Sequence, residues 1–348
     1  MKFHALSAIL ALSASVALLP TAPAQARDLT VVNFGGANGD AQNIAFNKPY
    51  EKKTGKPLIA VPYNGEQAKV KAMVDSHNVV WDAVEIETGD LGRGCDEGLY
   101  ENIDWSKILD KSDLVPGTLN YCGVGAFVWS TVLAYNSDTL KTAPTSWADF
   151  WNVKKFPGKR ALRKGAHYNV EFALMADGVA PKDVYKVLAT PEGVDRAFKK
   201  LDELKPYILW WEAGAQPPQM LASGDVVMSS AFNGRIDAAR HEGRPLNIVW
   251  NQSIYDFDYW VVPTGTPKKQ EAIDYIRYVT SPTAQAEYAR NIAYGPVSKA
   301  ALDKLDKNRL ANLPNSPSNG SNALFSNADF WTDHGEELEQ RFTAWAAR

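Results

Sequence analysis

Short apolar runs alternate with amphipathic segments along the first hundred residues of the chain. Residues 29–34, 58–63 and 81–86 have the apolar character of buried strands, whereas 41–53 and 67–74 carry apolar positions at helical spacing. Strands that alternate with helices in this way are typical of a largely parallel sheet covered by helices. The first part of the chain is therefore predicted to form an α/β lobe.

The pattern continues beyond this lobe with a change of character near residue 136. An apolar strand is predicted at 127–136, and the chain that follows it is predicted to enter a second, more helical lobe. Residues 147–156 form an aromatic amphipathic segment. Further strands are predicted at 226–229 and 247–250, and helices at 169–176, 181–188, 191–204, 218–223, 236–241, 272–279, 282–290 and 336–345.

One stretch, 255–260 (YDFDYW), combines two carboxylates with aromatic rings. Strict alternation in a strand places Asp256, Asp258 and Trp260 on one face and the other rings, beginning with Tyr255, on the opposite face. Two interpretations are open. The stretch is either a solvated edge strand or the wall of a cleft where carboxylates meet an ammonium group and rings pack against its methylenes.

Residues 1–26 have the features of a secretory signal peptide. Lys2 precedes an uncharged apolar run at 5–19, and the segment ends in Ala-Gln-Ala at Ala26. The run of about 15 residues is shorter than the roughly 20 that span a bilayer. We therefore expect cleavage before Arg27, export to the periplasm and no transmembrane helix in the remaining chain.

Composition and cysteine content narrow the class of protein. The 348 residues are 45% hydrophobic and 22% charged, with a formal net charge of −3, which gives no indication of a nucleic-acid or anionic-membrane partner. About 320 residues follow the signal, more than one core comfortably holds, so two lobes are expected. Cys95 and Cys122 are expected to form a disulfide, because an exported pair without C-x-x-C spacing favours neither a metal nor a redox site.

Two further stretches hold candidate ligand-binding residues. The glycine-rich turn at 35–40, which includes Gly36 and Asn38, leaves backbone N–H groups free for a polar or anionic group. It matches neither the dinucleotide fingerprint nor the P-loop. Polar residues follow at the end of the third strand, Glu85, Glu87, Thr88 and Asp90, and open α/β sheets bind ligands at the carboxyl ends of strands. A plain tight turn and a solvated loop are the respective alternatives.

Enzymatic motifs are absent from the sequence. G-x-S-x-G and H-E-x-x-H do not occur, and carboxylates that are neighbours on one strand cannot flank a glycosidic bond from opposite sides. We expect no enzyme activity, no cofactor and no metal site. A ferric-ion binder would use carboxylate and phenolate oxygens, and the absence of a Tyr-Tyr pair disfavours it.

Seven segments, in order along some 300 residues, carry a family resemblance. They are NFGGANGDAQNIAFNKPYEKKTGK at 33–56, WDAVEIETGDLGRGCDEGL at 81–99, CGVGAFVWSTVLAYN at 122–136, KFPGKRAL at 155–162, WWEAGAQPPQML at 210–221, FNGR at 232–235 and YDFDYWVVPTGT at 255–266. In this order they resemble the bacterial extracytoplasmic solute-binding proteins of ABC importers, in the branch of the spermidine/putrescine-binding proteins.

The resemblance implies a type II periplasmic-binding-protein fold. Two α/β lobes, each a mixed, mostly parallel sheet flanked by helices, are joined by a hinge of two strands and close on a ligand between them. Residues 27–133 with 260–300 would form lobe 1, and 134–259 with 301–348 would form lobe 2. The implied partners are a small amine-bearing solute and the membrane permease of an ABC importer, with the protein acting as a monomer.

The resemblance also implies roles for individual residues. In polyamine-binding relatives, rings enclose the alkyl chain and acidic residues hold the ammonium ends. By position, Asp258 matches such an acidic residue, Phe232 and Tyr294 match aromatic walls, and Asp256 is an added carboxylate. The full set of predicted ligand-binding residues is Asp256, Asp258, Tyr255, Trp260, Phe232, Asn233, Arg235, Tyr294, Gly36, Asn38, Glu87, Thr88, Trp129, Ser130, Trp211 and Tyr168.

Two classes of ligand follow from these residues. The main expectation is a polyamine such as putrescine or spermidine. However, residues 35–38 replace family aromatics, an expected acidic pair is missing near Gly165 and Tyr168, and Arg235 could grip a carboxylate. The alternative is therefore a zwitterionic ω-amino acid such as 4-aminobutyrate, with Asp256 and Asp258 on its amine and either Arg235 or the backbone amides at 35–36 on its carboxylate. The alternative role for Arg235 is an internal ion pair with Asp256 or Asp258 rather than a contact to the ligand.

Overall fold

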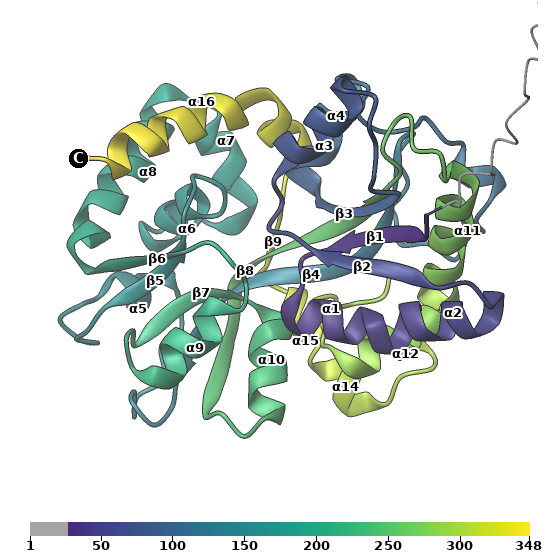
Figure 1. The fold of residues 1–348 in the computed structure, drawn as a ribbon. Helices are drawn as coiled ribbons and strands as arrows, with labels where there is room; N and C mark the ends of the chain where they lie inside the picture. The colour runs from purple at the N-terminus through teal and green to yellow at the C-terminus, as the bar shows by residue number, and fades with distance from the viewer. Residues whose placement is uncertain (1–26) are drawn as a thin grey trace, which may run out of the picture.

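A computed structural model of the protein describes residues 27–348, so the predicted signal peptide lies outside the described residues. Within this range one continuous sheet has the strand order β2-β1-β3-β8-β4-β7-β5-β6, with β9 paired to β8 (Figure 1). The strands are β1 Leu29–Asn33, β2 Leu58–Pro62, β3 Ala83–Glu87, β4 Gly123–Asn136, β5 Arg160–Arg163, β6 Ile208–Trp211, β7 Met228–Phe232, β8 Leu246–Val261 and β9 Leu324–Phe325.

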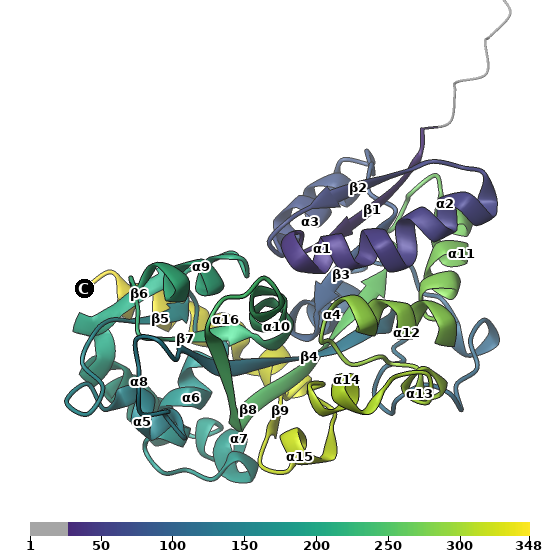
Figure 2. The same ribbon diagram turned by 90° about the horizontal axis from the view of Figure 1, so that it is seen from below.

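Two groups of strands flank a central antiparallel pair. β1, β2 and β3 pair in parallel at one end of the sheet, and β5, β6 and β7 pair in parallel at the other. The long strands β4 and β8 run between the groups (Figure 2). We call the β1–β3 group lobe 1 and the β5–β7 group lobe 2. The predicted fold class is confirmed: two α/β lobes, each mixed but mostly parallel, share two crossing strands.

The strand β8 unites two segments that the sequence pattern separates. The predicted strand at 247–250 and the stretch at 255–260 belong to one 16-residue strand. Between them Gln252 has φ of +60°, and the register with β4 shifts between Thr131 and Leu133. Such an irregularity bends a strand and breaks its alternation, which explains why the pattern indicated two strands.

The helices follow the predicted pattern with a few differences. α6 and α8 begin and end at the predicted residues, and Thr190 caps α8 by accepting a 3.1 Å bond from the Gly193 N–H. The helix expected at 41–53 is divided into α1, a π-helical turn at Asn43–Asn47 and α2. The helix α4 was not expected, because three glycines lower its helical propensity.

The helices have the following bounds: α1 Gly36–Gln42, α2 Lys48–Thr54, α3 Gln67–Asp75, α4 Thr88–Asp96, α5 Trp147–Trp151, α6 Asn169–Ala176, α7 Val184–Leu188, α8 Pro191–Leu204, α9 Gln216–Ser223, α10 Asn233–His241, α11 Lys269–Val279, α12 Pro282–Asn291, α13 Lys299–Leu302, α14 Lys307–Ala311, α15 Pro317–Gly320 and α16 Ala328–Ala346. None of the helices within residues 27–348 has both the length and the apolar content needed to cross a bilayer.

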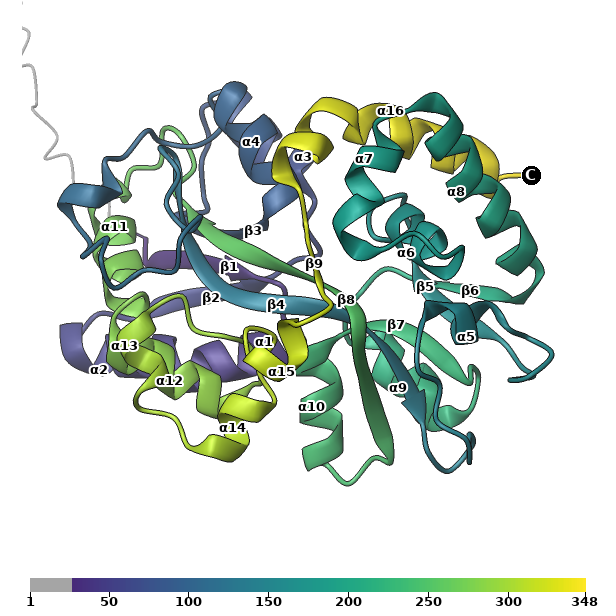
Figure 3. The same ribbon diagram turned by 180° about the vertical axis from the view of Figure 1, so that it is seen from behind.

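The chain crosses between the lobes a third time near its end. After α12 it passes through α13 to α15, and β9 pairs with the middle of β8, where Phe325 lies opposite Tyr255 (Figure 3). The following helix α16 packs on lobe 2, with the ring of Phe342 5.3 Å from that of Trp210. Its first turns also lie against α4 of lobe 1. The predicted lobe boundaries remain a proposal, and the packing of α16 supports placing it in lobe 2.

The predicted disulfide between Cys95 and Cys122 is present and links the end of α4 to the start of β4. The two Cα atoms are 6.0 Å apart and the cysteines are 27 residues apart in sequence. Closing a loop of that length stabilises the folded chain by about 3–4 kcal/mol on the chain-entropy model. The disulfide therefore fixes α4 to one of the two crossing strands.

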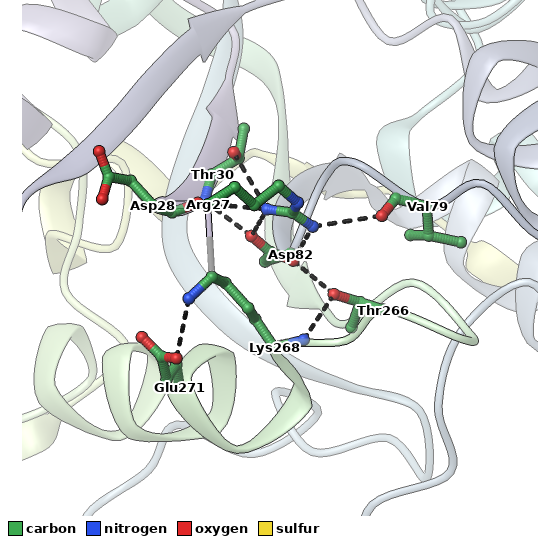
Figure 4. A network of polar contacts seen from close by, with 8 residues as sticks. All are labelled: Arg27, Asp28, Thr30, Val79, Asp82, Thr266, Lys268 and Glu271. Atoms are coloured by element: carbon green, nitrogen blue, oxygen red, sulfur yellow. Dashed lines mark hydrogen bonds and ion pairs between the residues drawn. The ribbon is translucent and has the colours of Figure 1, made fainter. Parts of the chain in front are cut away.

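A buried carboxylate lies where β1 and β3 begin (Figure 4). Asp82 is fully buried and accepts hydrogen bonds from Arg27 Nη1 at 2.5 Å, from Arg27 Nη2 at 2.7 Å and from the Thr30 N–H at 2.7 Å. The Thr266 hydroxyl donates to it as well. Arg27 Nη2 also donates to the Val79 carbonyl at 3.2 Å. This carboxylate therefore has both a cation and several neutral donors, as a buried charge requires.

Candidate functional site

Acidic and aromatic side chains share one face of the sheet where the lobes meet. Glu87 lies opposite Asp258 on the neighbouring strand β8, and Asp258 lies opposite Phe127 on β4. Residues that alternate along a strand or lie directly opposite each other share a face, so Glu85 and Trp129 belong to the same side. The register of three strands therefore gathers carboxylates beside rings in the centre of the molecule.

These side chains enclose a small chamber between the lobes. Its volume is about 20 Å³, which is room for roughly one water molecule. A solute can therefore enter only if the walls move apart, which is possible because the walls come from both lobes. The lining residues are Phe34, Asn38, Glu85, Glu87, Phe127, Trp129, Phe232, Arg235, Asp258 and Tyr294.

An acidic pair, Glu85 and Asp258, forms one part of the chamber lining. Both side chains are buried, with exposed fractions of 0% and 4%. Trp129 Nε1 donates to Asp258 Oδ1 at 2.6 Å, and Asn38 Nδ2 donates to Glu85 Oε1 at 2.8 Å. The amide of Gln42 donates to the other oxygen of Glu85. These donors are neutral, and within residues 27–348 no lysine or arginine forms a direct ion pair with either carboxyl, although the charge of Arg235 in the same chamber acts to lower the pKa of Glu85.

Burial and mutual repulsion change the acidity of this pair. Burial, followed by the charge of Glu85, raises the pKa of Asp258 well above its ordinary value. Burial likewise raises the pKa of Glu85. Two carboxyl groups in contact inside a protein resist simultaneous ionisation, so the pair tends to retain a proton. An ammonium group beside the pair would remove that resistance.

Arg235, from the first turn of α10, supplies a positive charge to the same chamber. Its Nη1 donates to the Gly35 carbonyl at 2.7 Å and its Nη2 to the Phe34 carbonyl at 3.0 Å, both in lobe 1. Its Nε is buried and has no hydrogen-bond partner within the described part of the chain. Arg235 therefore bonds to backbone carbonyls rather than to either aspartate, and it retains a free donor.

The glycine-rich turn approaches this guanidinium closely. Gly35 and Gly36 have φ of +55° and +51°, a region that L side chains rarely adopt. A Cβ atom at Gly36 would collide with Arg235 Nη1. The turn predicted as a ligand contact therefore has the conformation that admits Arg235 from the opposite lobe.

Aromatic rings form most of the remaining lining. The rings of Phe127 and Tyr294 stack at 4.9 Å with an interplanar angle of 4°. The rings of Trp129 and Phe232 meet edge to face at 5.0 Å. Rings in these two arrangements present flat apolar walls, against which the methylenes of a short alkyl chain pack well.

Asp256, the second aspartate of the stretch, lies outside the chamber lining. It accepts from the Thr88 hydroxyl at 2.5 Å, from the Phe257 N–H at 2.7 Å and from the Tyr168 hydroxyl at 3.3 Å. Burial raises its pKa to about 7. Asp256, Thr88 and Tyr168 thus form a network of their own next to the hinge, with Tyr168 held at φ of +71°.

The other predicted residues take supporting positions around the chamber. Asn233 accepts from the Ser130 N–H at 2.9 Å and donates to the Ala293 carbonyl at 2.6 Å, which joins α10 to β4. Trp211 packs edge to face behind Phe232 at 5.3 Å. Trp260 is buried against Tyr275 of α11, while Tyr255 faces Phe325 of β9.

Four residues beyond the predicted set belong to this region: Phe34, Glu85 and Phe127 line the chamber, and Arg163 pairs with Glu87 at 2.7 Å. Glu85 lies beside Glu87 among the polar residues at the end of the third predicted strand but is not in the predicted set, although alternation places the two on one strand face. Phe34 ends the first predicted strand beside the glycine-rich turn. Nothing in the local sequence distinguishes Arg163, because its partner comes from the other lobe.

Comparisons with known proteins agree with this architecture. The sequence model of the bacterial extracellular solute-binding proteins matches residues 45–315. A γ-aminobutyric acid-binding protein of Pseudomonas aeruginosa is 57% identical over 96% of this chain and 95% of its own length. The spermidine/putrescine-binding periplasmic protein of Escherichia coli is 26% identical over 76% of each chain.

Solved structures show the same likeness. An ABC transporter substrate-binding protein from Bradyrhizobium japonicum has a TM-score of 0.84 and 37% identity, covering 91% of this chain and 99% of that one. A structure described as a GABA receptor has a TM-score of 0.82 and 35% identity, covering 92% and 98%. These relatives are binding proteins rather than enzymes, as expected from the sequence. This chain belongs to the bacterial extracellular solute-binding proteins, the substrate-binding components of ABC transporters.

Proposed function

We propose that this protein captures a zwitterionic ω-amino acid, with 4-aminobutyrate as the first candidate, for delivery to an ABC permease. The observation that carries the proposal is the charge pattern of the chamber. A buried guanidinium with a free Nε and a buried acidic pair that has no direct ion-pair partner among residues 27–348 line the same small space. A ligand that carries one charge of each sign satisfies both.

Each part of such a ligand has a matching group. The ammonium group would bind Asp258 and Glu85, whose hydrogen-bond donors are neutral. The carboxylate would accept from Arg235 Nε, because charge-assisted bonds of this kind are among the strongest in proteins. The methylenes would lie between the rings of the chamber, with Trp129 and Phe232 among them.

A diamine fits the same charges less well. Glu87 is already paired with Arg163 at 2.7 Å, so only the acidic pair is available for cations. The second ammonium of putrescine would then share the chamber with Arg235, and like charges in a buried site repel strongly. The polyamine expectation therefore requires Arg235 to leave the chamber, whereas the ω-amino acid does not.

The relatives support the same choice of ligand. The 57% identical protein from Pseudomonas aeruginosa is named for γ-aminobutyric acid, and so is one of the structural neighbours. The polyamine-binding relatives in the comparison are 23–27% identical. A pocket for a particular solute depends on a few side chains, so the more similar relative is the better guide.

Capture would proceed by hinge closure in the periplasm. Lobe 2 contributes Arg235 and Phe232, and lobe 1 contributes Glu85 and Asn38, so the site is complete only when the lobes meet. A ligand favours the closed state by the contacts that it makes there and lacks in the open state. The closed, loaded protein would then dock on its permease as a monomer.

Titration calorimetry of the purified mature protein with 4-aminobutyrate, putrescine and spermidine tests the proposal. We expect 4-aminobutyrate to bind and Arg235→Ala to weaken it on the order of 100-fold, because a charge-assisted bond is lost. Arg240→Ala, an exposed arginine on the same helix, is the matched control and should leave the affinity unchanged. Binding of diamines alone, with Arg235→Ala without effect, would refute the proposal in favour of a polyamine receptor.

A further inference from the structure

Two hollows lie outside the chamber and meet along α16. One, of about 660 Å³, has Glu87 in its lining together with residues of α4 and α16. The other, of about 880 Å³, has Arg163 and Lys164 in its lining together with residues of β6 and α16. Both include Glu339 and Thr343. Each hollow is far larger than the chamber of about 20 Å³.

One ion pair stands between the chamber and these hollows. Arg163 Nη1 lies 2.7 Å from Glu87 Oε1 and 3.0 Å from Glu87 Oε2. Glu87 ends β3 in lobe 1, Arg163 ends β5 in lobe 2, and Glu87 lines both the chamber and the first hollow. The guanidinium also lies over the ring of Phe232, 5.6 Å from its centre. The pair therefore closes the chamber on the side that faces α16.

The backbone at Arg163, the last residue of β5, and the residues that follow it are fixed by hydrogen bonds. Asn169 Nδ2 donates to the Arg163 carbonyl at 2.6 Å and to the Gly165 carbonyl at 2.7 Å. Glu339 of α16 accepts from the Ala166 N–H at 2.9 Å. The side chains of Arg163 and Glu87 are 21% and 14% exposed, so the pair is mostly removed from solvent. A partly buried pair on fixed backbone forms a firmer wall than a surface pair does.

We propose that the Glu87–Arg163 pair is the wall that limits the length of the ligand. With a short ω-amino acid inside, the lobes would close less fully than in this structure, whose chamber holds roughly one water molecule, but the pair would still form. A longer homologue would have to push its end between Glu87 and Arg163 and separate them, which leaves two partly buried charges without partners. The choice of ω-amino acids as the ligands rests on the proposed function. That the Glu87–Arg163 pair closes one side of the chamber does not depend on it.

The test compares two double variants, each of which removes one acidic and one basic side chain. Glu87→Ala/Arg163→Ala takes away the wall. Lys164→Ala/Glu212→Ala takes away a neighbouring pair at 3.0 Å that is exposed and lies wholly within lobe 2. Glu87→Ser is a milder version, which leaves the packing of Arg163 on Phe232 in place. The probes are 4-aminobutyrate and 6-aminohexanoate, which has two more methylenes, each titrated calorimetrically into every variant.

The decisive quantity is the ratio of the two affinities. We expect the wild-type protein and the Lys164→Ala/Glu212→Ala control to favour 4-aminobutyrate, and loss of the wall to reduce that preference at least tenfold. If both ligands weaken equally and the ratio stays constant, Glu87 acts only as a general contact for the ammonium group, and the proposal is overturned.

A second measurement needs no ligand. Trp129 Nε1–H faces the chamber, where it donates to Asp258 at 2.6 Å. Its exchange with solvent in the unliganded protein can be followed by NMR, with Trp129→Phe identifying the signal. We expect exchange at least tenfold faster without the wall and unchanged in the control, whereas equal rates would overturn the wall. Failure of 4-aminobutyrate to bind the wild-type protein would refute the proposed function but leave this measurement decisive.

Discussion

Two buried carboxylates, Asp82 just before the strand β3 and Glu85 at its middle, have different hydrogen-bond partners. Asp82, just before the strand, receives two bonds from the Arg27 guanidinium (Figure 4). Glu85, within the strand, receives bonds from neutral amides and adjoins Asp258, and within residues 27–348 no lysine or arginine pairs with either. The first site carries its own cation and belongs to the scaffold. The second has no direct cationic partner, although Arg235 lines the same chamber, and under the proposed function the ammonium group of the ligand takes that place.

Removing the carboxylate of the scaffold site should have the largest effect on stability. Asp82→Ala leaves Arg27 and the Thr30 N–H without their acceptor, and loss of one partner of a buried pair costs about 3 kcal/mol in the free energy of unfolding. Urea denaturation measures the change. The affinity for 4-aminobutyrate should stay the same, because Asp82 lies outside the chamber.

The control for this prediction is an exposed ion pair. Asp104→Ala removes the partner of Lys107, whose side chain is 81% exposed, and should change the free energy of unfolding far less than Asp82→Ala does. If Asp82→Ala were as mild as Asp104→Ala, the distinction between a scaffold carboxylate and an exposed one would fail at this site.

Neutralising Asp258 in the chamber should lower the affinity for the ligand without lowering the stability of the protein. Asp258→Asn keeps an oxygen for the Trp129 N–H but removes the charge that would bind an ammonium group. We expect the affinity for 4-aminobutyrate to fall about 100-fold, equivalent to about 2.7 kcal/mol. The free energy of unfolding of the unliganded protein should stay constant or rise, because a buried charge is removed. A marked loss of stability with unchanged affinity would contradict the comparison.

The dependence of stability on pH should sharpen the comparison further. Burial raises the pKa of Asp258 well above its ordinary value and that of Asp256 to about 7. Between about pH 4 and these values the folded protein holds protons that the unfolded chain has released. The unfolding free energy should therefore fall as pH rises from about 4 to 7, by up to about 1.4 kcal/mol per pH unit for each group.

Urea midpoints measured across this pH range test the linkage. Asp258→Asn should flatten the decline, because one of the groups that retains a proton is gone. A decline of equal slope in the wild-type protein and in Asp258→Asn would show that the pH dependence arises elsewhere, for example from Glu171, whose pKa burial raises to about 8.

The sequence predicted most of the fold because the fold depends on local periodicity. α6 and α8 were located to the residue, since Thr190 and Pro191 mark the start of α8 and apolar spacing marks its length. The exceptions have local causes. The glycines of α4 give its sequence a low helical propensity, and tertiary packing and the disulfide stabilise this helix. The strand β5 is too short to show a recognisable alternation of apolar and polar residues.

The chamber was predictable only in part, because it is assembled from distant segments. The stretch at 255–260 indicated a cleft wall, and Asp258 does line the chamber. The sequence pattern predicted the same ligand-binding role for Asp256 and Asp258 because they share a strand face. What separates them is the set of neighbours: Thr88 and Tyr168 bond to Asp256, while Glu85 adjoins Asp258. Such neighbours come from other strands and cannot be read from spacing.

The third crossing by β9 and the packing of α16 have a consequence for folding. Lobe 2 draws Phe342 of the last helix against Trp210, and lobe 1 is incomplete until β8 pairs with β3. Both lobes thus depend on contacts between residues far apart in the chain, which lowers the rate of folding. The last contacts of both lobes therefore form only when the C-terminal residues of the chain are available.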